Sequence, residues 1–221
     1  MSGKLIMNAV VLYDHQTDTL WSQFLSAGVR GPLSGTRLEI IPSVQTTWEQ
    51  WLQLHPTTLV LDKGGRYQSD AYERYYRDGS AGILGEANKD NRLPRKELVL
   101  GVATDGGAKA YPFSAISQQR VINDRFDGDE VVVTFDPDSE TGAIFQRMLD
   151  GQSLTFQPAG TNDLGIMLME DQQTGSTWQA FTGQAVSGPL TGKVLERLPS
   201  HYSFWFAWSD FHPDTELWEV G

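Results

Sequence analysis

The chain of 221 residues contains no cysteine, and this absence excludes three kinds of chemistry. A disulfide framework, a thiolate metal site and a cysteine nucleophile are all unavailable to it. Histidine is scarce as well, with four residues, so imidazole ligands and bases are few. We therefore expect no bound cofactor, and cysteine usage does not indicate a redox compartment.

Basic clusters and long apolar runs are also lacking. The 17 Lys and Arg residues are outnumbered by 28 Asp and Glu residues, which gives a formal net charge of −11. Such a charge repels phosphate backbones and anionic membrane surfaces, so nucleic acid is excluded as an expected partner. No apolar run approaches the roughly 20 residues of a transmembrane span, and the N-terminus has no signal-peptide pattern. We expect a soluble globular protein.

One stretch of sequence occurs twice in the chain. Residues 14–58 recur without a gap at residues 171–215, an offset of 157 residues (171 − 14). Because the repeated residue types set turns and anchor cores, we predict the same local backbone in both segments: strand, turn, strand, Gly-Pro turn, strand, helix, strand. The repeated positions in the first segment are Asp14, Thr17, Trp21, Gly31-Pro32-Leu33, Gly35, Pro42-Ser43, Trp48, Trp51 and His55-Pro56.

The size of this offset indicates a domain-scale unit, because the layers of a solenoid typically repeat every 20 to 50 residues or so. We predict a truncated first unit over residues 1–64, a connecting segment over 65–92 and a complete second unit over 93–221. Gly3 matches Gly160 at the same offset, which places Met1 inside the unit. A truncated reading frame or an excised fragment would explain such a beginning.

The expected fold class is α+β, with predominantly antiparallel β-sheet, short helices and internal duplication. Short apolar runs bounded by turn residues predict strands over residues 7–13, 98–103, 130–135, 143–148 and 164–169. The Asp105-Gly106-Gly107 and Asp127-Gly128-Asp129 segments offer the positive φ angles that tight hairpins require.

Two matched helices are expected near the ends of the repeated segments. A capping-box pattern starts at Thr46 and predicts a helix that runs to Leu54 and ends at His55-Pro56. Its twin spans residues 203–211. Residues 70–77, in the connecting segment, have tyrosines at helical spacing and predict a further short helix.

Several short motifs occur in a fixed order along almost the whole chain. They are YDHQT at 13–17, LWSQ at 20–23, GPLSG at 31–35, LPRKELVLGV at 93–102, AYP at 110–112 and VIND at 121–124. Together they resemble the domain of unknown function family 3179. A strand in this family typically runs into a V-T-Y-C-P-L-C-G-T-A segment, where Asp136 and Ser139 stand here in place of the two cysteines. The family's C-x-x-C pair suits a redox couple or a soft metal, and Asp with Ser suits neither.

The repeated Asp, Trp and His residues are the candidate ligand-binding set, and each has a structural alternative. Indoles stack on sugars and other flat ligands, but large aromatics at helical spacing are usually core. An Asp after a strand commonly closes an Asx-type turn, and a His at a helix end can cap the last carbonyls. The set comprises Asp14, Trp21, His55, Asp171, Trp178 and His212.

A short acidic run at Asp136, Asp138 and Glu140 is the candidate metal site, since carboxylates bind Ca²⁺ and Mg²⁺. It is not an EF-hand, because Thr141 occupies the required glycine position and Arg147 the twelfth. The alternative is a solvated, proline-containing turn.

No catalytic motif of the serine hydrolase, zinc protease or dinucleotide-binding kind occurs. One interpretation is a non-catalytic binding or structural module whose partner is a small molecule, a glycan or a protein. The alternative is a fragment or degenerate copy of a redox or metal-dependent enzyme whose cysteine-bearing unit lies upstream. The resemblance also implies export, if a signal peptide precedes Met1.

Overall fold

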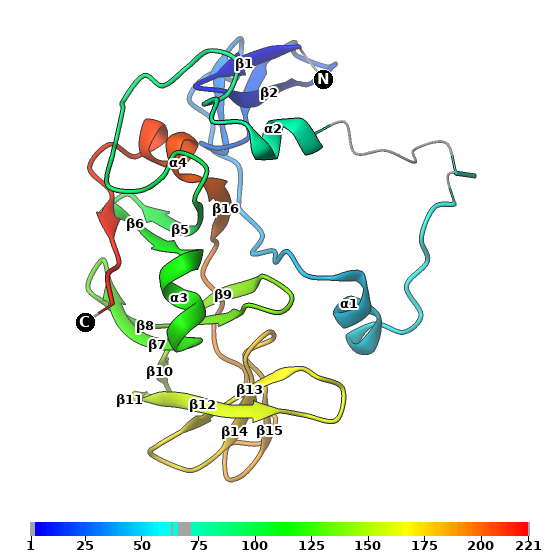
Figure 1. The fold of residues 1–221 in the computed structure, drawn as a ribbon, viewed down its shortest axis with the longest axis vertical. Coiled ribbons are helices and arrows are strands. Elements are labelled where there is room, and N and C mark those ends of the chain that lie inside the picture. The colour runs from blue at the N-terminus through cyan, green and yellow to red at the C-terminus, as the bar shows by residue number, and fades with distance from the viewer. Residues whose placement is uncertain (1–2, 63, 66–71, 221) are drawn as a thin grey trace.

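The computed structural model describes residues 3–62, 64–65 and 72–220 of the chain. Within these residues, most of the regular structure is antiparallel β-sheet, accompanied by short helices (Figure 1). The predicted fold class of mostly antiparallel β-sheet with short helices is therefore confirmed.

The N-terminal part forms a four-stranded antiparallel meander, here called the first sheet. Its strands follow one another in the order β1-β2-β3-β4. They are β1 (Lys4–Ile6), β2 (Ala9–Tyr13), β3 (Leu20–Ser22) and β4 (Ala27–Arg30). The strand expected from residue 7 starts at Ala9, because Met7 and Asn8 take positive φ angles and form the turn after β1.

A second meander, the second sheet, has the same strand order and much the same register. Its strands are β12 (Phe156–Thr161), β13 (Met167–Asp171), β14 (Thr177–Gln179) and β15 (Ala185–Ser187). The register shifts beside Trp178, as it does beside Trp21 in the first sheet. The strand expected from residue 164 begins at Met167, because Asn162 and Gly165 are joined by a turn hydrogen bond of 2.9 Å.

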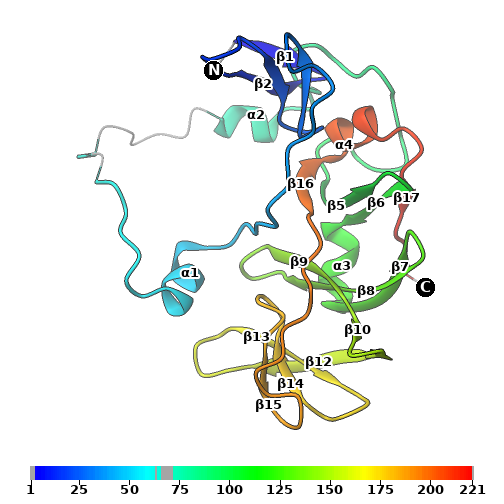
Figure 2. The same ribbon diagram turned by 180° about the vertical axis from the view of Figure 1, so that it is seen from behind.

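Two further sheets form the body between the meanders, as the reverse view shows most clearly (Figure 2). One has the order β16-β5-β6-β17 and the other the order β7-β8-β9. The strands are β5 (Leu98–Thr104), β6 (Gly107–Pro112), β16 (His201–Phe204), β17 (Glu216–Leu217), β7 (Val121–Phe126), β8 (Asp129–Asp136) and β9 (Thr141–Gln146). A small ladder of β10 (Met148–Leu149) and β11 (Gln152–Ser153) follows β9.

The turns of the two body hairpins differ in their conformation. Asp127 and Gly128 both have a positive φ, as expected for the tight turn between β7 and β8. The same expectation is wrong for Asp105 and Gly106, neither of which has one. Gly106 is needed for a different reason, since a Cβ there would lie 2.0 Å from a carboxylate oxygen of Asp127.

Two buried clusters form most of the core. One lies between the β7-β8-β9 sheet and the second sheet, around Phe145, Phe156 and Trp178. The other lies between β5, β6, β7 to β9 and the helix α3 (Phe113–Gln119), around Leu100, Tyr111 and Ile144. The first sheet has little core of its own, and Val11 is its buried apolar side chain.

The remaining helices are α1 (Trp48–Leu54), α2 (Glu73–Arg77) and α4 (Trp205–Phe211). The N-cap of α1 is Thr47, one residue after the expected start, and its side chain accepts the Gln50 N–H at 3.3 Å. The expected twin helix over 203–211 begins at Trp205, because residues 203–204 pair with β5 as part of β16. Residues 70–71 of the third expected helix lie outside the described residues.

Candidate functional site

The repeated Asp and Trp residues bond to each other inside the second sheet. The indole Nε1 of Trp178 donates to Asp171 Oδ2 at 2.9 Å, and the Thr174 amide donates to Asp171 Oδ1 at 2.6 Å. Both Asp171 and Trp178 are fully buried. The arrangement is therefore a turn closed by a carboxylate and anchored by an indole.

The first sheet contains the same arrangement nearer the surface. Trp21 donates to Asp14 Oδ2 at 2.8 Å, and the Thr17 amide donates to Asp14 Oδ1 at 2.6 Å. The hydrogen bond from Trp21 and that from the Thr17 backbone lower the pKa of Asp14 to about 2. Trp21 is only half-buried, so the expectation of a buried indole fits Trp178 better than Trp21.

The repeated histidines end the two matched helices. The backbone N–H of His55 donates to Trp51 O at 2.8 Å, and that of His212 donates to Trp208 O at 2.9 Å. Each imidazole packs on the indole one turn earlier, with ring centroids 4.2 Å apart in α1 and 4.3 Å apart in α4. These histidines therefore cap through their backbone amides, while their rings serve packing.

His212 belongs to an aromatic cluster at the contact between the first sheet and α4. Phe24, in the turn after β3, stacks on Phe211 at 4.2 Å and on His201 at 5.3 Å, with His212 at 5.8 Å. Burial lowers the pKa of His201, and burial together with the charge of His201 lowers the pKa of His212.

A groove of about 480 Å³ opens beside this cluster. Its lining includes both histidines, Phe24, and the ion pair between Arg37 and Asp105, whose side chains meet at 2.8 Å. Asp171 and Trp178 are not among its residues, since they lie in the second sheet at the opposite end of the molecule (Figure 1). The structure therefore does not bring the candidate Asp, Trp and His residues together.

The acidic run lies in the turn between β8 and β9, and its first residue is consumed by contacts inside the protein. Asp136 Oδ2 accepts from Ser139 Oγ at 2.6 Å and from Gln50 Nε2 at 2.8 Å. Asp138 and Glu140 are exposed. Among the described residues, no group of three or more His, Asp or Glu side chains is placed to hold a metal ion.

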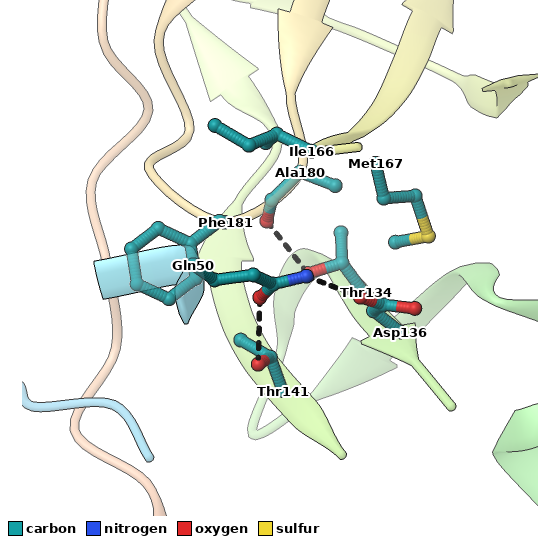
Figure 3. A pocket seen from close by; sticks show the side chains of 8 residues that line it. All are labelled: Gln50, Thr134, Asp136, Thr141, Ile166, Met167, Ala180 and Phe181. Atoms are coloured by element: carbon teal, nitrogen blue, oxygen red, sulfur yellow. Dashed lines mark hydrogen bonds between the residues drawn. The ribbon is translucent and has the colours of Figure 1, made fainter. Parts of the chain in front are cut away.

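The amide of Gln50 closes a small pocket at this point (Figure 3). Thr141 Oγ1 lies 3.3 Å from Gln50 Oε1 and 2.9 Å from Thr46 Oγ1, so the α1 segment is fastened to β9 as well as to β8. The cavity that remains is about 10 Å³, room for about one water molecule.

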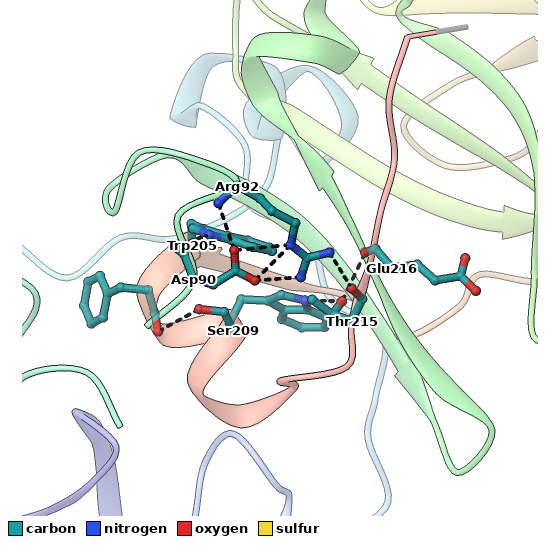
Figure 4. A network of polar contacts seen from close by, with 8 residues as sticks. Asp90, Arg92, Trp205, Ser209, Thr215 and Glu216 are labelled. Atoms are coloured by element: carbon teal, nitrogen blue, oxygen red, sulfur yellow. Dashed lines mark hydrogen bonds and ion pairs between the residues drawn. The ribbon is translucent and has the colours of Figure 1, made fainter. Parts of the chain in front are cut away.

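A second polar network holds α4 against the body (Figure 4). The guanidinium of Arg92 donates to Asp90 Oδ2 at 2.7 Å and to Thr215 O at 3.1 Å, and it lies 5.2 Å from the centroid of the Trp205 ring. Trp208 Nε1 donates to Thr215 Oγ1 at 2.9 Å. The matching bond in the first segment, from Trp51 to Thr58, is also 2.9 Å.

Three of these residues were not among the sequence candidates. Phe24, His201 and Gln50 occupy variable positions between the repeated residues, and their counterparts are Phe181, Val44 and Ala207. Phe24 is conserved as an aromatic at its match, which was the available signal. For His201 and Gln50 the repeat carries none, because each acts at a contact made by one segment alone.

Comparison with known families agrees with this architecture of antiparallel meanders and short helices. The chain belongs to the family described as "Protein of unknown function (DUF3179)", which it matches over residues 1–215. No curated protein and no solved structure matches the chain. None of the helices within the described residues is long and apolar enough to span a membrane.

Proposed function

We propose that this protein is a non-catalytic binding module whose ligand occupies the groove beside Phe24, His201 and His212. The carrying observation is the groove itself, whose volume of about 480 Å³ falls within the range of small-molecule sites, roughly 300 to 1,000 Å³. Its aromatic and imidazole lining and its one ion pair suit a flat, polar small molecule or a glycan better than a lipid.

The absence of a catalytic constellation in the groove supports binding without catalysis. Within the described part of the chain, no hydrogen bond joins the ring of His201 or His212 to a carboxylate or a hydroxyl. A histidine base in a nucleophilic mechanism needs both an orienting partner and a nucleophile within reach. Packing on Phe24 and Trp208 gives these rings a recognition role instead.

We also infer that the two matched segments are copies of one unit, with a first unit over residues 1–64, a connecting segment over 65–92 and a second unit over 93–221. The shared strand order of the two sheets supports this division. So do the Trp–Asp bonds of 2.8 and 2.9 Å, which recur at the offset of 157 residues.

The alternative, a fragment or degenerate copy of a redox or metal-dependent enzyme, is favoured by one observation. Asp136 and Ser139, at the positions of the family's cysteines, lie within 2.6 Å of each other at the end of a buried strand. A C-x-x-C pair at these positions would be held close together. The residues present here supply no thiolate, so a redox role would belong to another unit.

An NMR titration tests the proposed site, with imidazole signals of His201 and His212 as the readout and a panel of aromatic carboxylates and disaccharides as probes. A binding probe should shift both signals saturably. Phe24→Ala should abolish the shift, whereas Leu33→Ala, on the exposed Gly-Pro turn, should leave it intact. Probes that bind while leaving both imidazoles unaffected would contradict the proposed groove.

Calorimetric titration with Ca²⁺, Mg²⁺, Zn²⁺ and Cu²⁺ separates the two functions. We expect no stoichiometric submicromolar binding, because one acidic turn without further oxygen ligands leaves a hard cation largely hydrated. Tight binding of any of these ions, lost in Asp136→Asn, would support the metal-dependent alternative.

A further inference from the structure

The two matched helices differ sharply in how they are covered. None of the seven residues of α1 is buried, whereas Trp205 and Trp208 of α4 are completely buried. Trp48, the counterpart of Trp205, is 48% exposed. Because the sequences place indoles at the same two positions, the difference comes from what packs on them.

The cover of α4 is the β5-β6 hairpin and the chain leading into it. Trp205 and Trp208 pack on Val99 of β5 and Ala110 of β6. A Cβ at Gly101 would lie 2.3 Å from the ring of Trp208, so this glycine makes room for the indole. The Trp205 amide also donates to Glu97 O at 2.8 Å.

The segments that flank α4 pair with the same hairpin. β16 lies antiparallel to β5, and β17 lies parallel to β6. Their counterparts, residues 44–47 and 59–60, form no strand. Leu59 is 95% exposed and Val60 is 72% exposed. Three consecutive parts of the first segment thus lack the one partner that all three counterparts share.

An unpaired polar atom marks the same surface. Asp210 of α4 is buried, and its carboxylate accepts the N–H groups of Ala87 and Asn88 at 3.2 and 2.6 Å. Its counterpart in α1 is Gln53, whose Oε1 is buried without a hydrogen-bond partner. Such an atom costs free energy until a donor reaches it.

We propose that residues 44–61 form a docking surface for an antiparallel hairpin of the β5-β6 pattern, supplied by another unit of this family. Trp48 and Trp51 would fill the places that Trp205 and Trp208 fill on the hairpin within this chain. Backbone amides leading into the bound hairpin would donate to Gln53. The inference rests on the proposed correspondence of the two units and is independent of the ligand groove.

The attachment of α1 to the body leaves this surface accessible. Gln50 points into the pocket at Asp136, while Trp48, two residues earlier, lies on a different face of the helix. The hairpin of the same chain cannot be the occupant, because α4 already covers it. A second copy of this chain is disfavoured for the same reason.

An extended chain tests the proposal. Residues 86–159 are joined directly to Gly3 of the full chain, because Gly160 and Gly3 match at the repeat offset. The added segment contains no tryptophan, so the extended protein has the same seven indoles. With 5-fluorotryptophan labelling, ¹⁹F signals assigned by single Trp→Phe variants report the access of a soluble paramagnetic quencher to each indole.

In the extended chain we expect quencher access to Trp48 and Trp51 to fall to the level of Trp205, which is the buried reference. Gly101→Val in the added segment should restore access to Trp51, because the new side chain occupies the indole's place. Unchanged access to Trp48 would overturn the proposal, whether or not the added segment is ordered, since α1 would then fail to do what α4 does. Equal protection with Gly101→Val would overturn the assigned hairpin pattern.

Two further measurements use the original chain. Trp48→Ala should leave its urea unfolding midpoint nearly unchanged, whereas in the extended chain the same substitution should lower the midpoint clearly. Sedimentation over a range of concentrations should show a monomer in which Trp48 stays accessible to the quencher. Protection of Trp48 in a concentrated sample of the original chain would assign the surface to a second copy and overturn the proposed occupant.

Discussion

Trp178 donates its indole N–H to Asp171 at 2.9 Å, and both side chains are fully buried. The bond joins the start of the turn after β13 to the middle of β14, the strand that follows. It therefore fixes the turn and fills the core of the second sheet with the same residue pair.

Trp178→Ala should reduce the free energy of unfolding by about 3 to 5 kcal/mol, because it leaves a large cavity and an unpaired carboxylate. Trp21→Ala is the matched control and should cost less, since Trp21 is half-buried. Urea unfolding followed by far-ultraviolet circular dichroism measures both variants. Equal losses would contradict the difference in burial.

Asp14 should make stability depend on pH in the acid range. Its pKa is lowered to about 2 in the folded protein, so its contribution is complete above its ordinary pKa near 3.8 and is lost as the pH falls towards 2. Asp14→Asn should lower the urea midpoint at pH 5, and the difference from the original protein should shrink below pH 4. Asp18→Asn, in the same turn, should not reproduce this pH dependence.

His201 and His212 should make stability depend on pH in a higher range. Their pKa values are lowered by burial, so the unfolded chain binds more protons as the pH falls below about 6.5, and stability decreases there. The Arg37–Asp105 ion pair in the same groove stays charged over this range. His201→Phe should weaken the pH dependence between 6.5 and 5, whereas a substitution of the exposed His15 by Gln should leave it unaltered.

Gln50 should hold α1 against the turn between β8 and β9. Gln50→Ala removes the bond to the Asp136 carboxylate, a charge-assisted bond worth about 1.5 to 3 kcal/mol. Hydrogen exchange of the α1 amides should then quicken by roughly tenfold or more. Glu49→Ala, on the neighbouring exposed residue, should leave the exchange unchanged, and equal effects of the two variants would exclude the attachment.

The sequence by itself determined the local structure where turn and capping residues act over short distances. The matched Asp-x-x-Thr and Gly-Pro-Leu motifs form matched turns because an Asx-type bond or a glycine with positive φ needs only its near neighbours. Strands β5 and β8 were predicted to within about one residue at each end, since their apolar runs are bounded by strong turn signals.

Only the tertiary structure decided which of the matched residues are buried and which polar groups meet. Trp48 and Trp205 have the same local sequence role, yet one is exposed and the other buried, because burial depends on a hairpin distant in the chain. The contacts of Gln50 with Asp136 and of Phe24 with His201 join residues 86 or more positions apart. Local propensity carries no information about such pairs, because their free energy arises only when packing brings the two elements together.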